Sequence, residues 1–406
     1  MNNKSKNTLK LMIKLALIIS CTSFITENPS KIFIQNNSIE IKSIASENFS
    51  DLQFLKPILK DKKVVYLGES SHYTKEFSKM KTRIVKFLNK ELGFEILAFE
   101  SPMGEINYFN FYKKSSEDTV LKYGTLSFFH TEEIKEVFKY ANASNDLKIF
   151  GIDIQLNSLK TLNSYLRSSL KEYVSDNEVE YFIKKDSVFI FSNQKEKEIL
   201  RENLIQSYNI IEGQIKARSL NSFNEKTDFL IKLIENKKYL TSCYGRNYSS
   251  STRDSLMAEN LRWLIKKRFE TKKIIVWAHN YHVLKNYPST YISNSKIMGA
   301  ILNKEFNSIS YTIGLYCNSG RLLVNNSELT VKKPRKNSLE YLINQSGYDY
   351  TFFDFSKIND FKNCSWVNNP IEALYSGFRV KDRLIPKESY DAIIQIKEVN
   401  PSKILY

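Results

Sequence analysis

Apolar positions along the chain gather into short continuous runs separated by amphipathic stretches. Runs rich in β-branched and aromatic residues occur at Val64–Glu69, Glu95–Glu100, Leu147–Asp153, Lys273–Asn280 and Ser308–Tyr316. Continuous rather than alternating apolar runs are typical of strands covered on both faces. The stretches between these runs have helical periodicity. The pattern predicts an α/β fold, with a three-layer α/β/α core around a mostly parallel sheet.

The pattern changes between Ser158 and Lys272, where almost every stretch has helical periodicity. We expect residues 158–250 to form a large helical insertion, as a cap or a second lobe that builds a cleft at the sheet edge. The core is then made of two parts, residues 51–157 and 251–406. Its second part includes a predicted helix near Ser338–Asn344 and predicted strands at Tyr348–Phe355 and Tyr390–Val399.

The first fifty residues differ from the rest. Three lysines precede a short apolar stretch, Leu11–Ser20, which is too short to span a membrane and is typical of a secretory signal peptide over residues 1–20. Ile18–Cys21 also resembles a lipoprotein box, so Cys21 is either a lipid attachment site or a chance cysteine. Residues 21–50, rich in Ser and Asn, are interpreted as a tether. These features predict export across the inner membrane, to the periplasm or to a lipid anchor at the cell envelope.

Composition excludes several classes of protein. A hydrophobic content of 42% rules out a disordered chain. The formal charge of +16 comes mainly from lysines scattered over all 406 residues, whereas nucleic-acid binders concentrate theirs on one face or arm. No nucleic-acid partner is therefore expected, and membrane contact only through Cys21. Cys243, Cys317 and Cys364 lie far apart and show neither zinc-site spacing nor a disulfide framework.

Three of the four histidines lie just beyond a predicted strand. His72 follows the first strand, and His279 and His282 follow the strand that begins at Lys273. The carboxyl ends of parallel strands meet at one edge of a sheet, so these imidazoles are expected to share a site.

Carboxylates also occur at the ends of predicted strands. Glu69, Glu100 and Asp153 each end a predicted strand. An acid at this position can also cap the next helix, and that alternative fits Asp153 as well as a functional role does. It fits Glu100 less well, because Pro102 already opens the following helix.

Three polar residues occupy helix faces that should be buried. Lys81 lies within the apolar arc of the predicted helix Glu76–Leu92, so it must reach solvent or meet a buried carboxylate, with Glu69 or Glu100 as the candidate partner. Arg253 and Asn260 lie on the apolar stripe of a later helix and also need partners. They would act as structural ties between insertion and sheet or as supports for the site.

The residue types suit hydrolysis by an activated water. No nucleophile-elbow, zinc-protease, phosphate-loop or dinucleotide motif occurs, so a serine nucleophile is not supported. An imidazole ordinarily titrates near neutral pH, which makes His72 the candidate general base, oriented by Glu69. His279 or His282, with Lys81, could stabilise an oxyanion or protonate the leaving alkoxide. The same residues could instead hold a divalent metal that generates hydroxide, and spacing does not separate the two mechanisms.

Seven segments together resemble the erythromycin esterase family. They are Leu67–His72, Lys75–Phe77 with Gly93-Phe94, Ala98–Glu100, Gly151–Asp153, Arg253–Asn260, Trp277–His282 and Tyr390–Ile393. The likeness covers roughly residues 50–400 in the family's order.

The resemblance implies an α/β/α core with a helical lobe and a deep cleft, and hydrolysis of a macrolide lactone without a tightly held metal or other cofactor. It implies His72 as the base for water, with Glu69, Glu100, His279 and His282 lining the site. Two departures point to a different substrate. Lys81 replaces an arginine nine residues past the first histidine, and His130 stands where the family often has tryptophan.

Three functional hypotheses follow. The first is an exported hydrolase that opens a macrolide lactone and so confers resistance. The second keeps the fold but acts on a cell-envelope carbohydrate or its acyl esters. The third is a binding lipoprotein that uses the same side chains to hold iron, haem or another metal.

Overall fold

One large sheet organises the protein. The computed structural model describes residues 29–144, 146–219, 224–244, 249–286, 296–324, 327–358, 364–375 and 380–406. Across these residues nine strands pair in the order β1-β8-β11-β6-β2-β5-β3-β4, with β7 beside β6. Their bounds are Ser38–Glu40 (β1), Val64–Leu67 (β2), Phe94–Pro102 (β3), Lys148–Asp153 (β4), Lys273–Trp277 (β5), Ser310–Val324 (β6), Ser327–Thr330 (β7), Tyr350–Asp354 (β8) and Ala392–Val399 (β11). All pairings from β11 to β4 are parallel, so the prediction of a mostly parallel sheet is confirmed.

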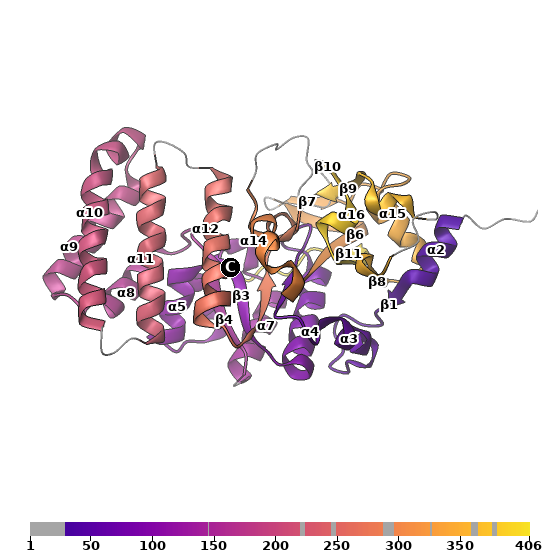
Figure 1. Ribbon diagram of the computed structural model, residues 1–406, viewed down its shortest axis with the longest axis horizontal. Coiled ribbons are helices and arrows are strands. Elements are labelled where there is room, and N and C mark those ends of the chain that lie inside the picture. The colour runs from indigo at the N-terminus through magenta and orange to yellow at the C-terminus, as the bar shows by residue number, and fades with distance from the viewer. Residues whose placement is uncertain are drawn as a thin grey trace, which may run out of the picture.

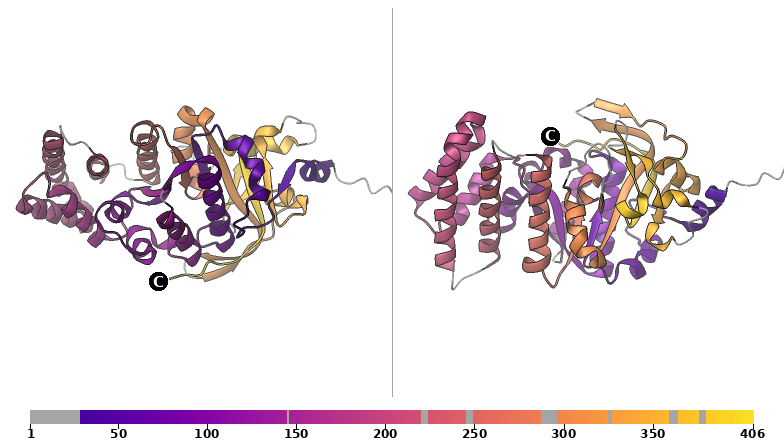
Figure 2. Two further views of the ribbon diagram at one scale, coloured as in Figure 1. Left: turned by 90° about the horizontal axis from the view of Figure 1, so that it is seen from below. Right: turned by 45° about the horizontal axis from the view of Figure 1, so that its top comes forward.

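Helices cover both faces of this sheet (Figure 2). Residues that alternate along each strand enter two separate hydrophobic clusters, one on each face. On one face the cluster includes α3 (Lys56–Leu59), α4 (Lys75–Leu92), α6 (Glu117–Gly124) and α7 (Glu132–Ala143). The other face carries α12 (Ser250–Trp263), α13 (Asn280–Val283), α14 (Met298–Phe306) and α15 (Leu339–Ile343). Burial on both sides explains the continuous apolar runs of the strands.

The inserted helices form a second lobe beside the sheet. These are α8 (Leu159–Leu170), α9 (Asp176–Phe191), α10 (Gln194–Ser219) and α11 (Glu225–Cys243). They lie beyond the β4 edge, next to α5 (Met103–Phe111), and surround a hydrophobic cluster of their own (Figure 1). The predicted helical insertion is confirmed, and it takes the form of a lobe rather than a cap.

The interpretation of residues 21–50 as a tether is wrong for the described part. Residues Pro29–Asn37 form α2, and β1 pairs antiparallel with β8. Ile34 and Ile41 are buried, so the segment contributes to the core despite its Ser- and Asn-rich composition. Arg83 also donates hydrogen bonds to the carbonyls of Ser43, Ser46 and Asn48.

The predicted signal peptide and Cys21 lie outside the described residues. Within the described chain, no helix combines the length and apolarity that a membrane crossing requires. The smaller elements of the second half are α16 (Pro386–Ser389) and a separate hairpin of β9 (Ile371–Tyr375) and β10 (Val380–Leu384). The strand predicted to run to Asn280 ends at Trp277, because α13 begins at that asparagine.

Candidate active site

The polar residues that follow β2 and β5 meet because Gly68 allows a close approach. A Cβ on Gly68 would lie 2.1 Å from Oδ1 of Asn280, so only glycine lets the start of α13 pack against the end of β2. The backbone N–H of Asn280 donates to the carbonyl of Glu69 at 2.8 Å. This contact sets the segment that carries Glu69 and His72 against the one that carries His279 and His282.

Glu69 lies between a buried lysine and His72. Its Oε2 accepts from Nζ of Lys81 at 3.0 Å, and its Oε1 is 2.9 Å from Nδ1 of His72. The Lys81 side chain is 0% exposed, and its ammonium also contacts the carbonyl of Ala278 and lies 4.2 Å from the ring centroid of Trp277. Burial lowers the pKa of Lys81 to about 8 although Glu69 opposes the shift. Burial alone would raise the pKa of Glu69, but Lys81 and His72 hold it below its ordinary value, so Glu69 is a carboxylate.

His72 is the accessible imidazole of the site, with 25% of its side chain exposed. Because Glu69 is ionised, Nδ1 of His72 donates to it, and Nε2 is the ring nitrogen that does not face Glu69. The ring stacks on Phe128 with centroids 4.1 Å apart and lies edge-on to Phe129. The His279 ring lies 5.0 Å away between centroids. His72 is therefore fixed by a carboxylate at one nitrogen and by aromatic packing on its face.

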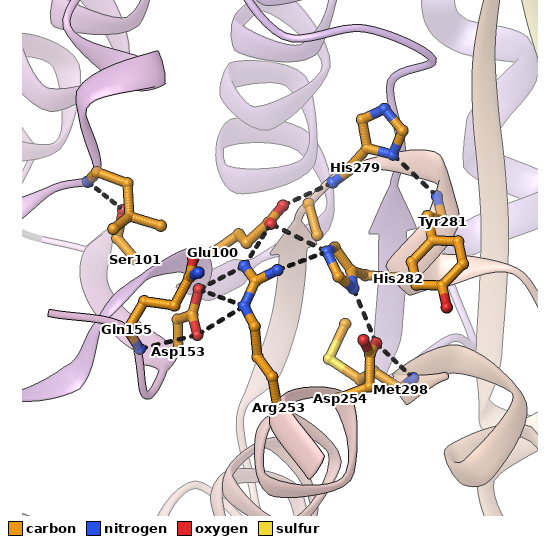
Figure 3. Close-up of polar contacts among 12 residues, drawn as sticks. Glu100, Ser101, Asp153, Gln155, Arg253, Asp254, His279, Tyr281, His282 and Met298 are labelled. Atoms are coloured by element: carbon orange, nitrogen blue, oxygen red, sulfur yellow. Dashed lines mark hydrogen bonds and ion pairs between the residues drawn. The ribbon is translucent and has the colours of Figure 1, made fainter. Parts of the chain in front are cut away.

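Arg253 organises a second network at the ends of β3 and β4 (Figure 3). Its guanidinium donates from Nε and Nη2 to the carboxylate of Asp153 and from Nη2 to Oε1 of Glu100 at 2.8 Å. Nη1 lies 3.1 Å from Nε2 of His282. Asp153 also accepts from the backbone N–H groups of Ile154 and Gln155, but it does not cap the next helix, because Ser158 is the N-cap of α8.

His282 is held between two carboxylates. Nδ1 lies 2.8 Å from Oδ1 of Asp254, and Nε2 lies 3.2 Å from Oε1 of Glu100. Burial would lower the pKa of His282, but Glu100 and Asp254 outweigh it and raise the pKa to about 10. Burial opposes ionisation of Glu100 as well, yet His282 and Arg253 lower its pKa well below the ordinary value. The network is therefore ionised at neutral pH.

His279 differs from His282 because it is neutral. Burial, followed by the electrostatic effect of His72, lowers the pKa of His279 to about 3. Its Nδ1 accepts from the backbone N–H of Tyr281 at 3.2 Å, so the ring proton resides on Nε2. The backbone N–H of His279 donates to Oε2 of Glu100, which links the two networks.

Two other candidate residues, Asn260 and His130, make contacts that belong to the packing of the fold. Asn260 donates to the carbonyl of Ile152 and accepts from Asn236 of α11, so it ties the lobe to the sheet, one of the two roles considered for it. His130, the other candidate for substrate binding or support of the site, lies outside both networks as the described residues form them. Its Nε2 contacts the carbonyl of Thr125, and its ring packs edge-on against Tyr406.

Sequence reasoning missed three participants. Asp254 was visible only as the neighbour of Arg253, and its pairing with His282 depends on how α12 and α13 pack. Phe128 and Phe129 follow no predicted strand and carry no titratable group. Neither a strand-end position nor a charged side chain on an apolar face could therefore point to them.

Comparisons with known proteins show which family the chain belongs to. The family model for erythromycin esterase matches residues 90–399. The chain belongs to the erythromycin esterase family. The family places it among hydrolases. The family model begins at residue 90 and does not include His72. The alignments with the relatives described next are longer and include the segment that carries His72.

Full-length relatives of this family cover most of the chain. "Putative hydrolase YbfO" of Bacillus subtilis is 30% identical over 87% of this chain and 88% of its own length. Erythromycin esterase type II of Escherichia coli is 23% identical over 89% of this chain and 95% of its own length.

Solved structures share the fold. A crystal structure described as a succinoglycan biosynthesis protein has a TM-score of 0.78 at 22% identity, over 94% of this chain and 99% of that one. A mutant of the erythromycin esterase EreC in its open conformation has a TM-score of 0.65 at 15% identity, over 88% of this chain and 96% of that one.

One cavity borders the candidate site, and a larger groove lies next to that cavity. A cavity of about 290 Å³ adjoins Asp153 and is lined by Glu105 and Lys237 together with apolar residues of the lobe, among them Leu233. A groove of about 1280 Å³ runs between α11 and α12 and shares Asn236 with the first cavity. Among the described residues, no three or more His, Cys, Asp or Glu side chains have an arrangement suited to a metal ion.

Proposed function

We propose that this protein is a carboxylic ester hydrolase that opens a macrolide lactone by means of a water activated by His72. One observation carries the proposal. A partly exposed imidazole is held at Nδ1 by a carboxylate that is itself ion-paired to a buried lysine, and a neutral imidazole faces it. An oriented base beside a hydrogen-bond donor is the minimum that ester hydrolysis by water requires.

His72 would act first as base and then as acid. Its Nε2 takes a proton from water while the water oxygen bonds to the ester carbonyl carbon. Glu69 stabilises the resulting imidazolium, and Lys81 keeps Glu69 ionised for that task. When the tetrahedral intermediate collapses, the carbon–oxygen bond of the ester breaks and Nε2 returns its proton to the leaving alkoxide. The products are a carboxylic acid and an alcohol.

His279 is suited to the charge that develops on the carbonyl oxygen. As a neutral imidazole with its proton on Nε2, it can donate a hydrogen bond and cannot compete with His72 as an acid. The backbone of His279 is fixed by Glu100, which Arg253 and His282 hold ionised. The second network therefore positions the donor without taking part in proton transfer.

The position of the cavity beside Asp153 supports a bulky substrate. Parallel strands lie about 4.8 Å apart, so the three steps from β2 to β4 separate His72 from the cavity beside Asp153 by roughly 14 Å. A molecule that occupied both positions would have the dimensions of a substituted large ring. The relationship to erythromycin esterase type II supports the macrolide assignment and its consequence, antibiotic resistance.

The direct test is incubation of purified protein with erythromycin. We expect a product heavier by the mass of one water molecule, and none from a His72→Ala variant that keeps the circular dichroism spectrum of the parent. Hydrolysis retained by His72→Ala would overturn the mechanism. Stoichiometric iron or haem in protein without turnover would replace the esterase proposal by the binding hypothesis.

Localisation is part of the proposal. The basic and apolar pattern of residues 1–20 supports export, and Cys21 is the candidate for lipidation. Fractionation of producing cells, with Cys21→Ser as the matched variant, tests this. We expect the parent protein at the envelope and the variant released from it, whereas protein confined to the cytoplasm would refute export.

A further inference from the structure

The backbone immediately after His72 has a conformation that needs support. Tyr73 has φ of 53°, in the left-handed region that residues other than glycine seldom adopt. This turn separates His72 from the first turn of α4, which begins at Lys75. The orientation of the imidazole therefore depends on what holds the peptide groups of residues 73–76.

The segment that follows β11 holds them. The backbone N–H of Ser402 donates to the carbonyl of Tyr73 at 2.8 Å, and Thr74 forms an antiparallel bridge with Pro401. The N–H of Lys75 donates to the carbonyl of Asn400 at 3.0 Å. Asn400 in turn donates to the carboxylate of Glu76 from its backbone N–H and from its side chain.

The next residues of the same segment hold a second loop in the same way. The N–H of Leu405 donates to the carbonyl of His130 at 3.0 Å, and the N–H of Glu132 donates to the carbonyl of Lys403 at 2.9 Å. Thr131 and Ile404 form the antiparallel bridge between these bonds. The second loop directly follows Phe128 and Phe129, the two rings that contact His72.

We propose that residues 400–405 position the general base by joining the loop that carries His72 to the loop that carries its aromatic support. Ser402 and Leu405 are the positioning residues, and they act through their backbone N–H groups. Each half of the segment pairs with one loop, so the segment sets the distance between the loop that carries His72 and the loop that follows Phe128. The kinetic part of this inference rests on the proposed function, whereas the positional part does not.

Two matched pairs of variants test the proposal. Ser402→Pro removes the N–H that binds Tyr73, whereas Ser402→Ala keeps it and deletes a buried hydroxyl that has no hydrogen-bond partner among the described residues. Leu405→Pro removes the N–H that binds His130, and Leu405→Ala keeps it while trimming the side chain. A chain ending at Ser402 gives an additional test. It loses the contacts to the second loop and, with Tyr406, the contacts to Asp118 and Lys122.

The readouts are the imidazole NMR signals and the steady-state kinetics. The chain has four histidines, so the His72 signals can be assigned with a His72→Gln variant. Stacking on Phe128 shifts the ring protons upfield. We expect this shift to diminish in both proline variants and in the shortened chain, with kcat about fivefold lower and KM unchanged, while both alanine variants match the parent.

Unchanged His72 signals and unchanged kcat in folded proline variants would overturn the proposal. If a proline variant did not have the circular dichroism spectrum of the parent, the His72 signals and the kcat of the shortened chain would test the proposal instead. The two proposals can fail separately. If the parent protein hydrolyses no ester but the variants show the expected NMR changes, the proposed function is refuted and the positioning role is supported.

Discussion

Replacing Lys81 by methionine removes an ammonium that solvent does not reach, and leaves Glu69 buried without its counter-charge. The two charges lie 3.0 Å apart, which corresponds to roughly 5 kcal/mol at an effective dielectric constant of about 20. Breaking a buried pair by removing one partner typically costs about 3–5 kcal/mol, so we expect Lys81→Met to lower the free energy of unfolding by that amount at pH 7, below the pKa of Lys81. Urea denaturation followed by circular dichroism measures it.

The pH dependence and a second substitution make the test specific. Without Lys81 the folded-state pKa of Glu69 rises, so the loss of stability should be largest above that pKa and shrink as the pH falls to 5 and Glu69 takes up a proton. Adding Glu69→Gln should recover much of the loss, because no buried charge is then left unpaired. A Lys81→Met protein as stable as the parent, or a double variant no more stable than the single one, would refute the reasoning.

The remaining predictions concern activity and use erythromycin hydrolysis as the assay. Because the pKa of Lys81 is about 8, the rate should fall as the pH rises through 8, and Lys81→Arg should remove this alkaline limb, since arginine stays charged; an identical pH profile would contradict the role. His279→Leu should lower kcat by about 10²-fold with little change in KM, and a change in KM alone would place His279 in substrate binding instead. Prolonged dialysis against EDTA should leave the rate unchanged, and loss of activity restored by a divalent metal would favour the metal mechanism. Leu233→Trp, which fills the cavity beside Asp153, should raise KM for the macrolide and leave hydrolysis of a small aryl ester unaffected; equal effects on both would show that the cavity does not hold substrate.

The sequence predicted the sheet and the strand-end residues because both follow from local patterns. A continuous apolar run that ends in a polar residue is read directly from neighbouring positions, which is why Glu69, Glu100 and His279 could be placed at one edge. Lys81 was recognisable for a related reason, since a charge within an apolar helical arc requires a partner. Its contact with Glu69 was one of two possibilities considered.

What the sequence could not predict depends on contacts between distant segments. The Asp254–His282 pair joins residues 28 positions apart through the packing of two helices. The burial of Ile34 and Ile41 depends on β1 joining the sheet edge beside β8, a strand more than 300 residues away. His130 was recognisable only as a departure from the family's sequence, and its contacts with Thr125 and Tyr406 join segments that no spacing rule brings together.

The separate hydrophobic core of the helical lobe has a consequence for how substrate range can diversify. The lobe packs around its own cluster of apolar residues, distinct from the two that cover the sheet, and lies beyond the β4 edge (Figure 1). In the proposed function, substitutions that reshape the lobe act on substrate recognition while the β2 and β5 strand ends keep their geometry. A lineage with this architecture can acquire new substrates by drift in one region and retain its chemistry in the other.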